Sequence, residues 1–105
     1  MNKLKGHHFT GGPDAAGYTT IVKLPDGQEA MADIIWNQEF RCWEYGAKIL
    51  GAGHEFSTNY TTKTKEAASD QALVDLCTVV GRWVLATERE KAESITGWKA
   101  WRDGL

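Results

Sequence analysis

The chain has 105 residues, of which 42% are hydrophobic and 25% charged, and its formal net charge is −2. This length predicts one domain, able to bury about 65% of its unfolded surface without disulfides or metal. The composition excludes disordered and collagen-like chains, and no apolar run approaches the roughly 18 residues that cross a bilayer. Because the start lacks a secretory signal and two cysteines are too few for a disulfide framework, we expect a cytoplasmic protein.

The first 17 residues differ from the rest of the chain. They are rich in glycine and contain the turn signal Pro13-Asp14. Such composition is typical of a terminal segment outside the folded core. The sequence therefore predicts an N-terminal arm over 1–17 and a single domain over 18–105.

The segment 18–58 predicts an antiparallel meander of three to four strands. Residues 18–24 are β-branched and aromatic, and Pro25-Asp26-Gly27 predicts a hairpin turn into a second strand over 30–36. A third strand follows over 40–50. Residues 54–58 are either a short fourth strand or an edge segment.

The segment 64–93 predicts one long helix that begins at Thr64 as N-cap. Its core-facing stripe of apolar and small residues comprises Ala68, Ala72, Leu73, Leu76, Val80, Trp83, Val84 and Ala92. Gly81 within that pattern either permits close approach to the sheet or marks a bend. A short terminal helix follows, so we expect a two-layer α+β domain in which the long helix covers one sheet face.

The sequence does not decide which face of the sheet the helix covers. In the second strand, two sets of residues compete for the covered face: one set is Ala30, Ala32, Ile34 and Trp36, and the other is Met31 and Ile35. Both faces are partly apolar. A second covered face is therefore open, and its occupant is either another copy of the chain, giving a homodimer through the sheet, or a docked partner.

Signals for catalysis, metal binding or cofactors are weak. His7 and His8 are adjacent, so on an extended segment their side chains point to opposite sides, and Cys42 with His54 forms no marked nucleophile–base pair. The glycine-rich stretches do not join a strand to a helix, as phosphate loops do. We predict no catalytic residues, metal or cofactor, and a metal- or thiol-dependent small enzyme is the third hypothesis.

Nucleic-acid binding is the second hypothesis. A meander followed by the Thr- and Lys-rich segment 62–68 resembles small βββα modules, including the arm-type DNA-binding domains of phage integrases. The resemblance implies that the sheet offers lysine and arginine to phosphates, whereas this hypothesis uses Lys63, Lys65 and Arg82 from the helix side, with Lys3 and Lys5 of the arm assisting. Residues 18–58, however, carry three basic residues (Lys23, Arg41, Lys48) against six acidic ones (Asp26, Glu29, Asp33, Glu39, Glu44, Glu55), a sign that repels phosphates.

Protein binding is the first hypothesis. The chain has five tryptophans, and a domain of this size seats two or three in its core. We expect Trp83 in the core with Trp43 beneath it, whereas Trp98 and Trp101 either form an exposed anchor pair or fold back over the core. The predicted partner-binding residues are Asp33, Glu44, Glu55, Trp36, Trp98 and Trp101.

An acidic sheet with surplus aromatic residues and no catalytic motif resembles, in profile only, small phage-encoded inhibitors of host machinery such as anti-CRISPR proteins. That resemblance implies a non-enzymatic module that occupies a basic surface of a protein partner, as in a host nucleic-acid-binding complex such as CRISPR–Cas. Such inhibitors share no common motif, so the resemblance transfers no site residue.

Overall fold

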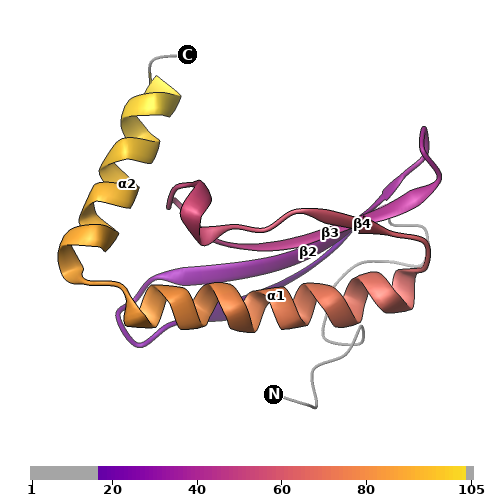
Figure 1. Cartoon of the computed structure of the whole chain (residues 1–105), viewed down its shortest axis with the longest axis horizontal. Helices are drawn as coiled ribbons and strands as arrows, with labels where there is room; N and C mark the ends of the chain where they lie inside the picture. Colours follow the sequence, from indigo (N-terminus) through magenta and orange to yellow (C-terminus); the bar gives the residue numbers. More distant parts are fainter. Residues whose placement is uncertain (1–16, 104–105) are drawn as a thin grey trace.

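The computed structural model describes the backbone of residues 17–103 and the side chains of residues 17–97. Four antiparallel strands form one sheet in the order β1-β2-β3-β4, and helix α1 lies along one of its faces (Figure 1). The strands are β1 (Gly17–Lys23), β2 (Glu29–Asn37), β3 (Cys42–Ile49) and β4 (Tyr60–Thr62), and the helices are α1 (Lys65–Leu85) and α2 (Glu88–Asp103). The expected α+β fold with an antiparallel meander and a covering helix is confirmed.

The hairpin between β1 and β2 forms as its turn residues predict. Gly27 has a φ of 89°, the left-handed region that glycine tolerates best. The Asp26 carboxylate accepts a hydrogen bond from the Gln28 amide at 3.0 Å, and the Leu24 amide donates to the Gln28 carbonyl. Local turn chemistry therefore sets the register of the first two strands.

The fourth strand lies later in the chain than 54–58. Residues His54–Phe56 form a 3-10 helix (η2), and Ser57 makes only an isolated bridge to Lys48. The strand proper, β4, pairs Tyr60–Thr62 with Trp43–Tyr45 at the other end of β3. The sheet edge is thus interrupted opposite the middle of β3.

The predicted single helix over 64–93 is two helices. Thr64 caps α1 by accepting a hydrogen bond from the Ala67 amide, as expected. The break comes at 86–87, where Thr87 and Glu90 form a capping box: the Glu90 amide donates to Thr87 Oγ1, and the Thr87 amide donates to Glu90 Oε1. This box starts α2, which stands at a steep angle to α1 (Figure 1) and extends the predicted short terminal helix back to Glu88.

The face of the sheet that α1 covers contains the smaller residues. Ala30, Ala32 and Ile34 of β2 are fully buried, and register places them beside Ile49, Ala47 and Tyr45 of β3. The buried face of α1 comprises Ala68, Ser69, Ala72, Leu73, Leu76, Val79 and Trp83. Of the predicted stripe, Val80 is half-buried and Val84 is exposed, because the helix face is centred one residue earlier, on Val79.

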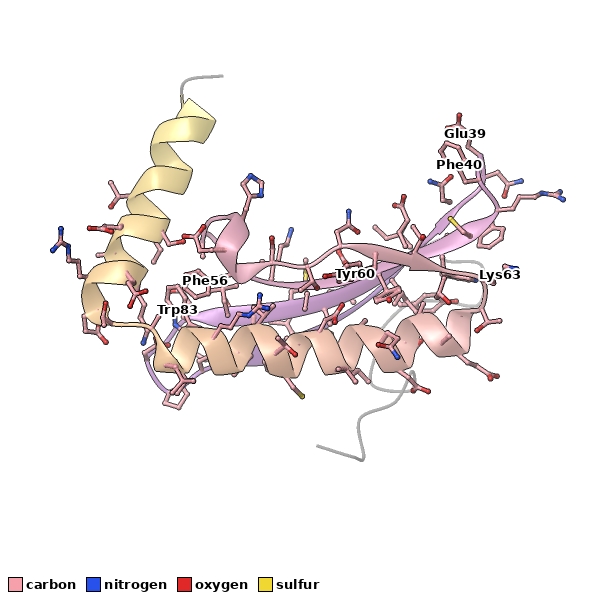
Figure 2. The ribbon with its side chains drawn as sticks, viewed as in Figure 1. Glu39, Phe40, Phe56, Tyr60, Lys63 and Trp83 are labelled. Carbon is pink, nitrogen blue, oxygen red and sulfur yellow. The ribbon has the colours of Figure 1, made fainter. Side chains whose placement is uncertain are left out.

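Trp83 is buried, as predicted, but its neighbour is not Trp43. Its ring meets Phe56 edge-on at 4.9 Å (Figure 2), and its indole Nε1 donates to Asp26 Oδ2 at 2.8 Å. Trp43 lies farther along the sheet, with Trp36 and Tyr18 as its aromatic neighbours. The two tryptophans sit at different places because β3 starts at the end of the sheet far from the β1–β2 turn.

The terminal tryptophans and the arm lie outside what is described. The backbone of Trp98 and Trp101 belongs to α2, but their side chains are beyond the described ones, as are residues 1–16 with Lys3, Lys5, His7 and His8. Within the described part of the chain, no helix is long and apolar enough to span a membrane.

Two glycines have opposite roles, and both interpretations of Gly81 are wrong. A Cβ at Gly81 meets nothing within 4 Å, and α1 runs through it without interruption. A Cβ at Gly46 would clash with the Thr58 carbonyl oxygen, because the segment after η2 crosses directly over this point of β3. Of these two positions, Gly46 is the one that must be glycine, because another segment of backbone passes close to it.

We predict opposite effects of alanine at these two positions. Gly46→Ala destabilises the fold by about 2 kcal/mol or more, because backbone must move. Gly81→Ala raises the free energy of unfolding by about 0.5–1 kcal/mol, since it improves helix propensity in open space. Urea unfolding followed by circular dichroism measures both, and equal effects of the two substitutions would contradict the assignment.

Candidate functional site

The sheet face opposite α1 is covered by no other described helix or strand. Register places on it Gly17, Thr19, Ile21 and Lys23 of β1, Glu29, Met31, Asp33, Ile35 and Asn37 of β2, Cys42, Glu44, Gly46 and Lys48 of β3, and Thr61 of β4. We call this set the outer face. Figure 1 shows α2 at one end of the sheet and the β2–β3 hairpin rising at the other, so the outer face lies between them.

A hollow of about 380 Å³ opens on the outer face. Its walls are strands β2 and β3 and the segment that follows η2, and its lining consists of Asp33, Ile35, Glu44, Tyr45, Ala47, Lys48, His54, Ser57, Thr58 and Asn59. Its volume falls at the lower end of the range typical of small-ligand sites. The interruption between η2 and β4 is what leaves this space beside β3.

Asp33 occupies the middle of the hollow's sheet wall. It is half-buried, and register places it directly opposite Gly46, which has no side chain to cover it. Within the described residues, the Asp33 carboxylate makes no hydrogen bond and no ion pair. Burial raises the pKa of Asp33 above its ordinary value, Lys48 opposes that rise and Glu44 adds to it.

A chain of hydrogen bonds holds the other wall in place. The Ala47 amide donates to Thr58 Oγ1, which donates to Asp75 Oδ2 on α1, both at 3.0 Å. The Thr58 amide also donates to the Ala47 carbonyl at 2.8 Å. Burial raises the pKa of Asp75, whereas the Thr58 hydroxyl lowers it. The segment over Gly46 is thus tied to both the sheet and the helix.

Large apolar side chains remain exposed on the outer face and at the hairpin tip. Ile21 is 53% exposed and Ile35 is 44% exposed, and both lie on the outer face. Phe40 is 71% exposed and projects with Glu39 from the raised hairpin (Figure 2). The tip is ordered by Asn37, whose Oδ1 accepts from the Phe40 amide and whose Nδ2 donates to Glu44 Oε2, both at 3.0 Å.

The structure brings two of the three predicted carboxylates together. Asp33 and Glu44 line the same hollow. Glu55 does not, because it belongs to η2, where a hydrogen bond from Ser94 of α2 lowers the pKa of its carboxyl. Ser94 Oγ also accepts from the Gly53 amide at 2.7 Å, so this contact joins η2 to α2.

Trp36 is on the other side of the sheet from these carboxylates. Strand alternation directs its side chain to the α1 side, where its ring lies 5.4 Å from Trp43 and its Nε1 donates to Gln38 Oε1 at 2.8 Å. It is half-buried in an aromatic cluster. Trp36 therefore does not extend the surface that Asp33 and Glu44 form.

The residues proposed for nucleic-acid contact do not converge. Lys65 Nζ lies 3.8 Å from the centre of the Tyr18 ring. Lys63 lies just before the start of α1 (Figure 2). Arg82 is in the last turn of the same helix, about 25 Å away at 1.5 Å per residue. Between Lys65 and Arg82, α1 contains no other lysine or arginine.

The thiol–imidazole pair is also not formed. Cys42 begins β3, whereas His54 lines the hollow with Lys48. Six residues of strand separate Cys42 from Lys48, which is about 20 Å at the rise of a β-strand. No group of three His, Cys, Asp or Glu side chains able to hold a metal ion occurs within residues 17–97.

Sequence reasoning missed Lys48, Asn59 and Phe40 as parts of this surface. Strand alternation in β3 gives a signal for Lys48, since it shares the parity of Glu44. No local signal indicates Asn59, because its position depends on the path of the segment after η2. Comparisons with protein families, with characterised proteins and with solved structures found no match for this chain.

We predict that Asp33→Asn raises the free energy of unfolding at neutral pH. The pKa of Asp33 is raised on folding, so its charged form disfavours the folded state once the pH exceeds that pKa. The advantage of the variant therefore shrinks as the pH falls through the folded-state pKa toward 3.8, where wild-type Asp33 is protonated in the folded state.

Glu55→Gln is the matched control with the opposite sign. Its carboxyl has a lowered pKa in the folded state, so the charged form stabilises folding, and that stability is lost as the pH falls. The variant loses stability at neutral pH and little at acid pH. Thermal unfolding of both variants at neutral pH and at a series of acid pH values measures the difference, and parallel curves would contradict the assignment.

Proposed function

We propose that this chain is a non-enzymatic protein-binding module whose outer face occupies a basic surface of a protein partner. The single observation that carries the proposal is the composition of that face: exposed Ile21 and Ile35 beside the half-buried, unpaired carboxylate of Asp33. Apolar side chains supply the area that a stable contact desolvates, and the carboxylates select a cationic counterpart. Binding would act by steric occlusion, with electrostatic steering of association.

The projecting hairpin supports the same proposal. Phe40 is exposed at an ordered tip, and aromatic residues, phenylalanine included, are enriched in the cores of protein–protein interfaces. Phe40 stands at the end of the outer face that is farther from α2 (Figure 2). A partner that contacts the outer face would therefore meet the hairpin tip as well.

The resemblance to small phage-encoded inhibitors extends the proposal to the class of partner. We infer a cytoplasmic target that itself binds nucleic acid, such as a CRISPR–Cas complex, because a surface that binds phosphates is cationic. Support for this step comes from the acidic excess of residues 18–58 and from the unpaired carboxylate. A second copy of the chain on the outer face is the competing occupant.

Charge reversal tests the role of the carboxylates. Asp33→Lys with Glu44→Lys slows association with a captured partner about tenfold or more at low salt, and weakens its dependence on salt. Glu55→Lys is the matched control, because Glu55 lies off the outer face and changes association less. Unchanged association of the double variant would contradict the proposal. The proposal would also be contradicted if the Ile35→Glu variant captured the same partner as well as the wild type does.

Measurement of mass in solution tests the competing occupant. The proposal expects a monomer at micromolar concentration, with the outer face free for a different protein. A stable dimer that Ile35→Glu converts to a monomer would show instead that the outer face binds a second copy.

A gel-shift titration with nucleic acid at low salt separates protein binding from nucleic-acid binding, since the proposal expects no shift.

A further inference from the structure

The Asp33 carboxylate is in an unusual position for an acidic side chain. It is half-buried at the centre of the sheet wall of the hollow, and within the described residues it has neither a hydrogen bond nor an ion pair. A carboxylate that loses water without gaining a partner costs free energy. Its most direct compensation is a cationic donor group that enters the hollow from outside the domain.

None of the described side chains around Asp33 serves as its cationic partner. Glu44 and Lys48 lie diagonally from it on β3, two residues to either side of Gly46, and both affect its pKa through space. Lys48 is exposed and does not reach Asp33 within ion-pair distance. His54 lies on the opposite wall of the hollow. On β1, the residue paired with Asp33 is Thr19. The two carboxylates outnumber the one permanent cation of the lining.

The shape and polarity of the hollow favour a guanidinium group over an ammonium group. A guanidinium is planar, offers a fork of donors to a carboxylate, and is more weakly hydrated, so its entry into a half-buried space costs less. The lining provides apolar surface from Ile35 and polar side chains from Ser57 and Asn59 for its other donors. A single arginine side chain would satisfy both sets.

We propose that this hollow is a receptor for one arginine side chain of the partner protein, in which Asp33 accepts hydrogen bonds from the guanidinium and Glu44 adds a second negative charge. The inference rests on the proposed function and names its recognition element. The positive charge of Lys48, which acts on Asp33 through space, weakens such binding by repelling the guanidinium. The surrounding Ile21 and Ile35 would contact the partner around the arginine.

Titration of the full chain with N-acetyl-arginine amide tests the receptor without any partner. We expect millimolar binding seen as saturable shifts of the backbone amide signals of Gly46, Lys48 and Asn59. N-acetyl-citrulline amide, the neutral analogue of the same shape, should not produce them, and N-acetyl-lysine amide should bind more weakly. Equal shifts with arginine and citrulline would overturn the proposal.

Variants of the lining residues should change the affinity for arginine in opposite directions. Asp33→Asn should weaken arginine binding by about tenfold or more, since it removes a charge-assisted contact. Lys48→Met should tighten it, because a repelling cation is removed. Glu55→Gln, which lies outside the hollow, should leave it unchanged. Binding that is equally strong in Asp33→Asn, or weaker in Lys48→Met, would overturn the proposal.

The receptor and the proposed function fail in different ways. Arginine binding without capture of any protein through the outer face would leave the receptor standing and remove the proposed function. Capture that depends on Ile35 and on the charges of Asp33 and Glu44, together with no arginine binding, would leave the function standing and remove the receptor. The two experiments therefore give separate answers.

Discussion

The packing of α1 against a single face of the sheet determines the rest of this structure. Small side chains on both sides make the contact close: Ala30, Ala32 and Ala47 from the strands meet a helix face that contains Ala68 and Ala72. Burial of these residues and of Ile34, Ile49, Leu76 and Val79 supplies the apolar area that stabilises the domain. With the helix placed on that side, strand alternation directs Asp33, Ile35, Glu44 and Lys48 to the other.

The outer face keeps its hollow because of the path of the chain after β3. A 3-10 turn and a single bridge replace a continuous fourth strand, and the Thr58 hydroxyl connects the returning segment to both β3 and α1. Gly46 permits this segment to pass directly above β3. The returning backbone therefore forms one wall of the hollow above Gly46, the cross-strand partner of Asp33 that has no side chain.

The corner where α1 ends connects the remaining elements. The Trp83 indole donates to Asp26 of the β1–β2 turn, and Lys91 of α2 lies 3.6 Å from the same carboxylate and 5.4 Å from the Trp83 ring. The indole hydrogen bond is the largest cause of the lowered pKa of Asp26. Together with the contact between Gly53 and Ser94, this corner holds α2 at one end of the sheet.

The sequence alone determined the features that depend on neighbours along the chain. The turn at Pro25-Asp26-Gly27, the cap at Thr64 and the meander-then-helix order follow from local backbone chemistry and from periodicity. The capping box at Thr87 and Glu90 was equally local, and it indicates the break between the two helices that periodicity alone conceals.

Only the tertiary structure decided which face is covered and which residues meet there. Ala30 and Met31 are equally compatible with a buried position, and the choice between them depends on how closely α1 must approach. Likewise, Asp33 and Glu44 became neighbours of Asn59 and Lys48, and Glu55 was separated from them, through pairings between residues distant in the chain. Such contacts reflect the free energy of packing the whole domain, which no local segment contains.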